Sequence, residues 1–118
     1  MSDAIPLIDR DELYAKLERG DDFVIVDALP PMSYAHSHLP GAINLPPRSV
    51  DASVAKRLPD RTVELVVYCA NEECEDSVET SERLFALGYV NVRHYAGGKD
   101  DWRNAGLPLE RAGAPYVA

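Results

Sequence analysis

The sequence predicts an α/β fold in which about five strands form a largely parallel central sheet flanked by helices. Short apolar runs alternate along the chain with segments of helical periodicity, and the connections between them are short. The apolar runs are continuous, which is typical of parallel strands buried on both faces. With 118 residues, the chain has the size of one domain, so we expect a single domain over 1–118 with its core over about 5–110.

In the first half of the chain, Asp9 and Glu12 have capping-box spacing and Gly20 supplies a helix stop. The proline pairs at 30–31 and 46–47 interrupt regular structure. The elements expected here are a helix over 10–19, a strand over 23–26 that ends at Asp27, a short helix over 32–37, a strand over 42–44 and a helix over 50–57.

In the second half, four strand-favouring residues run together from Leu65 to Tyr68. Asp76 and Glu79 repeat the capping-box spacing, and Gly88 ends the helix that they begin. The elements expected here are a strand over 65–68, a helix from about residue 76 to residue 87, a strand over 90–94 and a short helix over 100–104 that follows the Gly97-Gly98 turn.

Charge and composition exclude several classes of protein. Twelve Lys and Arg against 20 Asp and Glu give a net charge of −8, which disfavours nucleic acid and anionic membranes as partners. No apolar run approaches the roughly 18 residues of a membrane span, and the N-terminus lacks the features of a signal peptide. Two cysteines do not make a secreted disulfide framework. We therefore expect a cytoplasmic protein.

Candidate functional residues follow the strands, because ligands of open α/β sheets gather beyond the carboxyl ends of the strands. Asp27, Cys69 and the Gly97-Gly98 pair all fall at such positions. Cys69 directly follows the strand over 65–68 and precedes a loop and a helix. Backbone N–H groups of the loop and the helix N-terminus favour a thiolate, which is the nucleophilic form of cysteine. Burial as a small residue at a strand end is the alternative.

Four groups of residues, in this order along the chain, resemble the signatures of rhodanese-like sulfurtransferase domains. They are Phe23–Asp27 with Tyr34 and His38–Asn44, then Leu65–Cys69, then Leu87–Val92, and finally Gly97-Gly98 with Trp102 and Gly106–Pro108. The resemblance covers about residues 5–110. It implies that Cys69 attacks a sulfane sulfur, carries it as a persulfide and passes it to a thiol or another acceptor.

The resemblance also implies roles for the residues around Cys69. The active-site loop, whose backbone N–H groups would surround the sulfur, consists of Ala70, Asn71, Glu72, Glu73, Cys74, Glu75 and Asp76. Asp27, His38 and Trp102 match positions for which we expect structural support rather than chemistry. No metal or organic cofactor is implied, and His36 and His94 have no partner spacing that would indicate a metal site.

The loop departs from the family pattern in its charge. Family members often carry Arg shortly after the first-signature Asp, where this chain has Leu29, and their loops often include Gly and end with Arg-Ser, whereas this loop reads Cys69-Ala-Asn-Glu-Glu-Cys74-Glu-Asp-Ser77. The loop holds four carboxylates and no Lys or Arg, so we expect an anionic donor such as thiosulfate to be disfavoured against a persulfide donor. A related branch with the same fold hydrolyses phosphoesters through Cys-x5-Arg, but here the matching position is Glu75, which repels phosphate.

The role of Cys74 has two interpretations. Five residues from Cys69, it is a possible resolving thiol that attacks a persulfide or sulfenic acid on Cys69, or it only packs the loop. The main expectation is a sulfurtransferase. The alternatives are a catalytically silent module of the same fold that binds a partner protein, and a thiol redox sensor that uses Cys69 and Cys74.

Overall fold

A computed structural model describes residues 5–111 and contains one parallel sheet of four strands. The strands are β1 (Val24–Asp27), β2 (Ile43–Asn44), β3 (Leu65–Tyr68) and β4 (Val92–His94), in the spatial order β2-β1-β3-β4. The expected α/β architecture is confirmed, with four strands in place of about five. Beside β4, Leu7 adds a single parallel bridge to His94.

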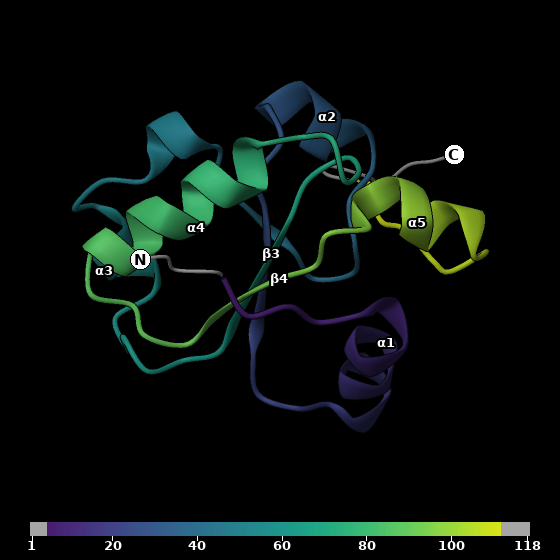
Figure 1. Cartoon of the computed structure of the whole chain (residues 1–118), viewed down its shortest axis with the longest axis horizontal. Helices are drawn as coiled ribbons and strands as arrows, with labels where there is room; N and C mark the ends of the chain where they lie inside the picture. Colours follow the sequence, from purple (N-terminus) through teal and green to yellow (C-terminus); the bar gives the residue numbers. More distant parts are fainter. Residues whose placement is uncertain (1–4, 112–118) are drawn as a thin grey trace.

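The helices pack on both faces of this sheet (Figure 1). They are α1 (Arg10–Arg19), α2 (Pro31–His36), the 3-10 helix η1 (Pro47–Ser49), α3 (Val54–Arg57), α4 (Asp76–Ala86) and α5 (Gly98–Asn104). Helices α3 and α4 lie on one side of the strands, and α1 and α5 lie on the other. The sheet therefore separates two apolar layers.

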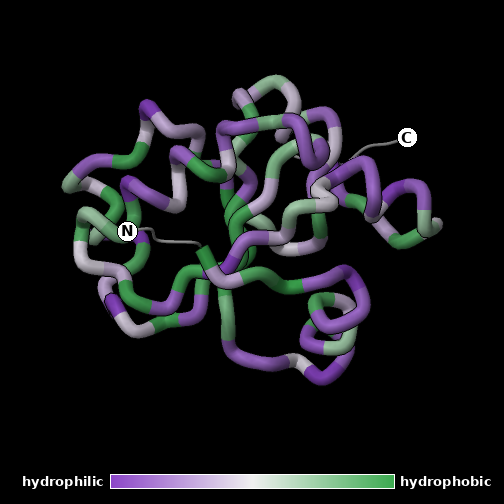
Figure 2. Tube along the Cα trace, in the orientation of Figure 1, coloured by the Kyte–Doolittle hydropathy of each residue, from purple (hydrophilic) through white to green (hydrophobic). Residues whose placement is uncertain are grey.

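Each layer has its own buried cluster, and Figure 2 shows the apolar residues gathered along the central strands. On the α4 side, Val67 and Cys69 pack with Leu84 and Val54. On the α1 and α5 side, the largest buried side chain is Trp102. Because successive residues of a strand point to opposite faces, Cys69 shares the α4 side with Val67.

Local capping explains where α1 begins. The side chain of Asp9 accepts a hydrogen bond from the backbone N–H of Glu12 at 2.8 Å, and Gly20 ends the helix at a φ of 71°. The carboxylate of Glu12 bonds Arg93 of β4 at 2.8 Å, which ties α1 to the sheet. The predicted helix over 10–19 is confirmed.

Two predictions about helices are wrong. The predicted helix over 50–57 is helical only over Val54–Arg57, because the carboxylate of Asp51 accepts from the backbone N–H and the hydroxyl of Ser53 and so holds a turn there. Asp76 does not cap α4; it is the first helical residue, and Glu75 precedes it without a side-chain capping bond.

No helix within residues 5–111 has the length and apolar character needed to cross a membrane.

Candidate active site

Cys69 lies at the carboxyl end of β3, where its residue is 1% exposed. The structure joins it to Cys74 in a disulfide, and the two Cα atoms are 6.3 Å apart. That separation lies within the range that disulfides span. The loop from Ala70 to Asp76 therefore folds back over the sulfur, and a substrate can reach Cys69 only when this loop moves.

The N-terminus of α5 holds the base of the same loop. The backbone N–H of Lys99 donates to the carbonyl oxygen of Cys69, and that of Asp100 donates to Ala70, both at 2.8 Å. Gly98 permits this approach: its φ is +69°, and a Cβ added there would lie 2.5 Å from the carbonyl oxygen of Cys69. The Gly97-Gly98 pair is thus tied directly to the backbone of the candidate nucleophile.

Two amides of the loop bond within the loop. Asn71 accepts from the backbone N–H of Glu73 through its side chain at 3.0 Å and from that of Cys74 through its carbonyl at 3.2 Å. The side chain of Asn71 also donates to Asp100 of α5 at 3.1 Å. In this conformation those two N–H groups do not face the sulfur, so the expected ring of amides around Cys69 stays a prediction for another state of the loop.

Sequence analysis missed two side chains near the sulfur of Cys69. Ser77 contacts the sulfur directly, and His94 contacts Ser77. The Sγ of Cys69 lies 3.2 Å from the Oγ of Ser77 in the first turn of α4, and that oxygen lies 2.8 Å from the Nε2 of His94 in β4. Ser77 is fully buried and His94 is half-buried. Burial lowers the pKa of His94 from its usual value. His94 pairs with Val67 of β3, which precedes Cys69 by two residues. Its place in the predicted strand over 90–94, next to the strand that ends at Cys69, is the signal that could have identified it.

Asp27 ends β1 beside Tyr68 of β3 and is fully buried. One carboxylate oxygen accepts from the backbone N–H of Leu29 at 2.8 Å, and the other accepts from the Tyr68 hydroxyl at 2.6 Å. Burial raises the pKa of Asp27, while these hydrogen bonds act in the opposite direction. The carboxylate therefore ties the ends of two strands to the following loop.

Lys99 is a second buried charge that the sequence did not single out. Its residue is 6% exposed, and its ammonium donates to the carbonyl oxygens of Ser33 at 3.1 Å and Ser37 at 2.7 Å. Burial lowers its pKa, and the charge of Asp27 opposes that effect. Lys99 thus joins α5 to the carboxyl end of α2.

The hydrogen-bond partners of His38 and Trp102 are backbone carbonyl groups and not the sulfur of Cys69. The Nδ1 of His38 is 2.8 Å from the carbonyl oxygen of Tyr34, and the two rings stack at 4.0 Å. The indole N–H of Trp102 donates to the carbonyl oxygen of Pro108 at 2.8 Å, and the side chain is fully buried. These contacts fix the turn after α2 and the segment after α5.

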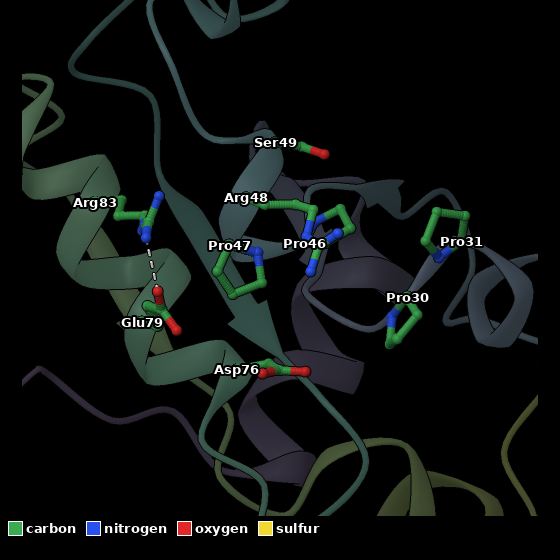
Figure 3. Close-up of a pocket in the computed structure, with 9 residues that line it drawn as sticks. All are labelled: Pro30, Pro31, Pro46, Pro47, Arg48, Ser49, Asp76, Glu79 and Arg83. Carbon is green, nitrogen blue, oxygen red and sulfur yellow. Dashed lines mark hydrogen bonds and ion pairs between the residues drawn. The ribbon is translucent and has the colours of Figure 1, made fainter.

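A groove of about 560 Å³ begins where the loop ends (Figure 3). Its lining consists of Pro30, Pro31, Pro46, Pro47, Arg48, Ser49, Asp76, Glu79 and Arg83. Arg83 bonds Glu79 at 2.8 Å, whereas Arg48 has no ion pair within the part of the chain that the structure describes. Of the four loop carboxylates, only Asp76 lines this groove; Glu72 and Glu73 line a separate hollow beside α5.

Comparison with known proteins agrees with this geometry. The family model of the rhodanese-like domain matches residues 9–105. Thiosulfate sulfurtransferase PspE of Escherichia coli strain K12 is 33% identical over 75 residues, which are 64% of this chain and 70% of that protein. Thiosulfate:glutathione sulfurtransferase of Saccharomyces cerevisiae is 30% identical over 94 residues, and the match covers 70% of this chain and 66% of that protein.

A third relative is longer than this chain. The HTH-type transcriptional regulator Rv0324 of Mycobacterium tuberculosis is 33% identical over 108 residues, which are 92% of this chain but 46% of the regulator. Among solved structures, the BH2092 protein from Bacillus halodurans has a TM-score of 0.84 at 23% identity, with 96% of this chain and 84% of that chain covered. The matched family model and the shared fold show that this chain belongs to the rhodanese-like domain family.

Proposed function

We propose that this chain is a sulfurtransferase that carries sulfane sulfur as a persulfide on Cys69. One observation supports this most strongly: within a rhodanese-like domain, the cysteine at the end of β3 lies under a loop that carries a second cysteine. Sulfurtransferases among the relatives agree with this class of reaction.

The transfer has two steps. The Cys69 thiolate attacks the outer sulfur of a donor persulfide; a new S–S bond forms, the donor S–S bond breaks, and the donor leaves as a thiolate. The thiolate of an acceptor then attacks the outer sulfur on Cys69, takes it, and regenerates the Cys69 thiolate. The Cys69–Cys74 disulfide must first be reduced by a thiol, because it occupies the nucleophile.

Cys74 provides a second outcome within the same loop. Its thiolate attacks the inner sulfur, which is the Sγ of Cys69, and the outer sulfur leaves as hydrosulfide. The product is the Cys69–Cys74 disulfide, and two further thiols reduce it to restart the cycle. Cys74 would then convert a transferase into a reductase of persulfides. A cytoplasmic setting suits this cycle, because thiols there keep such a pair reducible.

Charge disfavours thiosulfate as the donor. Glu72, Glu73 and Glu75 are exposed, and the loop has no cation of its own to offset them. Thiosulfate carries two negative charges and is repelled over roughly a Debye length, about 8 Å at physiological salt. PspE is named for thiosulfate, but no such donor is assumed for this chain.

Intact mass measurement tests the proposal. Reduced protein is incubated with a glutathione persulfide and, separately, with thiosulfate, and we expect a gain of one sulfur atom that reducing agent removes. Cys69→Ser should gain none, whereas Cys74→Ser, the matched change in the same loop, should still gain it. No gain with either donor would favour the silent protein-binding module, and unchanged loading of Cys69→Ser would overturn the choice of nucleophile.

The Cys69–Cys74 bond also supports a second candidate function, a thiol redox switch. The two functions differ in the reaction with sulfur: a switch alone forms the disulfide with oxidant but does not accumulate a persulfide. The same mass experiment, repeated with a mild oxidant in place of the donor, separates them.

A further inference from the structure

The register of the sheet places a histidine beside the candidate nucleophile. In the pairing of β3 with β4, His94 lies next to Val67, and Val67 points to the α4 side of the sheet. Cys69, two residues beyond Val67, points to the same side. Ser77 in the first turn of α4 lies between them, with its Oγ 3.2 Å from the sulfur and 2.8 Å from the Nε2 of His94.

We propose that His94 is a positioning residue that holds the proton of Cys69 through Ser77. The thiol proton passes to the oxygen of Ser77, the hydroxyl proton of Ser77 passes to the Nε2 of His94, and the products are a thiolate, a neutral serine and an imidazolium. Atoms and charge balance. The relay rests on the proposed function for its purpose, since it supplies the thiolate that attacks the sulfur donor.

The positions of the protons follow from the number of donors. Ser77 has one hydroxyl proton and two neighbours, so it donates to one and accepts from the other. When the Nε2 of His94 is unprotonated, Ser77 donates to it and the thiol of Cys69 donates to Ser77. When His94 is protonated, both bonds reverse, and the hydroxyl of Ser77 donates to the thiolate. The measured distances belong to the disulfide form, and reduction of the Cys69–Cys74 bond supplies the thiol for both states.

The surroundings of His94 favour the first of these states at rest. The part of α4 that is buried against the sheet offers Ser77, Ser81 and Leu84, which carry no charge. β3 offers Val67, and the N-terminal segment offers backbone groups, because the carbonyl of Pro6 accepts from the N–H of His94. Among the described residues, no charged side chain shifts the pKa of His94, and burial alone lowers it.

Neighbouring charges on β4 and α4 are engaged elsewhere. Arg93 bonds Glu12 of α1 and Glu64, and Glu79 bonds Arg83 on the exposed side of α4. A neutral imidazole that accepts from Ser77 is therefore the resting state, and only thiolate formation brings a negative charge to it.

The acidic loop explains why such a relay is needed. Two loop N–H groups bond Asn71, and the loop has no Lys or Arg to stabilise a thiolate. Its carboxylates disfavour the thiolate further. The serine hydroxyl passes the thiol proton to the imidazole, and the imidazolium so formed replaces the missing positive charge.

A thiolate titration tests the relay without any sulfur donor. In Cys74→Ser, Cys69 is the only cysteine, and its ultraviolet thiolate absorbance is followed against pH with the double serine variant as the blank. Adding His94→Gln, which keeps a hydrogen bond but cannot take a proton, should lower the thiolate fraction at neutral pH about tenfold. Ser77→Ala should do the same, and the two changes together should cost no more than either alone.

Controls separate this role from a structural one. His36→Gln, at an exposed histidine, should leave the titration unchanged, and Ser77→Thr should restore the wild-type midpoint. In NMR spectra the ring of His94 should respond to ionisation of Cys69, and Ser77→Ala should remove that response. A wild-type titration in His94→Gln overturns the relay. If the titration supports the relay but no donor loads sulfur onto Cys69, the proposed sulfurtransferase function is contradicted and the relay is not.

Discussion

The hydroxyl of Tyr68 donates to the carboxylate of Asp27 at 2.6 Å and joins the carboxyl ends of β3 and β1 beneath the loops. Both residues are fully buried. The hydroxyl oxygen of Tyr68 also accepts from the backbone N–H of Leu39 at 3.0 Å. This buried pair fixes the end of the strand from which Cys69 emerges, so its stability bears directly on the site.

Removing the hydroxyl should destabilise the protein in a pH-dependent way. Tyr68→Phe leaves one oxygen of the buried Asp27 carboxylate without its donor, while Leu29 still donates to the other, and this should cost about 1–3 kcal/mol of unfolding free energy. Because burial raises the pKa of Asp27 above its unfolded value, the folded state binds the proton more tightly, and stability falls as pH rises through that raised pKa. Loss of the hydroxyl raises the pKa further, so the destabilisation should be larger at neutral pH than at about pH 4.

Urea unfolding at the two pH values measures this difference. Tyr89→Phe is the matched control, because the buried hydroxyl of Tyr89 donates to the neutral carbonyl of Leu58. Its effect should be the same at both pH values. Equal pH dependence in the two variants would show that the Asp27 carboxylate is not the source.

Gly98 should be necessary for the loop to keep its shape. Gly98→Ala forces a left-handed φ on alanine, which costs about 1–2 kcal/mol, and also drives a Cβ against the backbone of Cys69 and Ala70. Gly106→Ala has the same kind of φ, +76°, with no atom within 4 Å of the added Cβ. Both variants should lose stability, but only Gly98→Ala should also lose sulfur loading by intact mass.

The comparison of these two glycines isolates the contact from the backbone strain. Loading that falls equally in both variants would mean that general destabilisation, and not the approach of α5 to Cys69, limits the reaction. Normal loading in Gly98→Ala would mean that the loop tolerates a shifted α5.

The sequence alone was sufficient for features that depend on local pattern. Continuous apolar runs predicted the buried parallel strands, and the position of Cys69 after such a run predicted a cysteine at the carboxyl edge of the sheet. The cap at Asp9 and the stop at Gly20 each depend only on residues within about one helical turn of that position. The bounds of α1 were therefore predicted as well.

Features that depend on register or on tertiary burial were not predicted. Ser77 and His94 are 17 residues apart, and only the packing of α4 against β4 brings them together. Lys99 is a residue type that is usually exposed, so no pattern marks its burial against α2. At Asp51 the side-chain carboxylate accepts the N–H of Ser53 and forms a turn in place of the helix. Helical periodicity does not reveal such competition between a side chain and the backbone.

Neutralising the exposed loop carboxylates should improve the use of thiosulfate. Glu72→Gln with Glu73→Gln removes two like charges near an anionic donor, so persulfide formation from thiosulfate should become faster, and more so at low salt. Because the carboxylates also disfavour the thiolate, alkylation of Cys69 by neutral iodoacetamide should become faster as well, but by less than the reaction with thiosulfate. Stopped samples analysed by intact mass give both rates.

A matched control carries the same change in net charge away from the loop. Glu18→Gln with Asp22→Asn lies at and beyond the carboxyl end of α1. This variant should leave the thiosulfate rate near that of the wild type. A wild-type protein that loads thiosulfate rapidly and independently of salt would contradict the charge argument.

Cys74 should determine the fate of sulfur on Cys69. With Cα atoms 6.3 Å apart, the two side chains reach each other in the closed loop, so the Cys74 thiolate can attack a persulfide on Cys69 and release hydrosulfide. In Cys74→Ser the persulfide should therefore persist longer by mass, and hydrosulfide release without an added thiol should fall to background. Peptide mapping of mildly oxidised wild type should give a Cys69–Cys74 link, which Cys69→Ser cannot form. Equal persulfide lifetimes in wild type and Cys74→Ser, with both cysteines oxidised separately, would leave Cys74 as a packing residue of the loop.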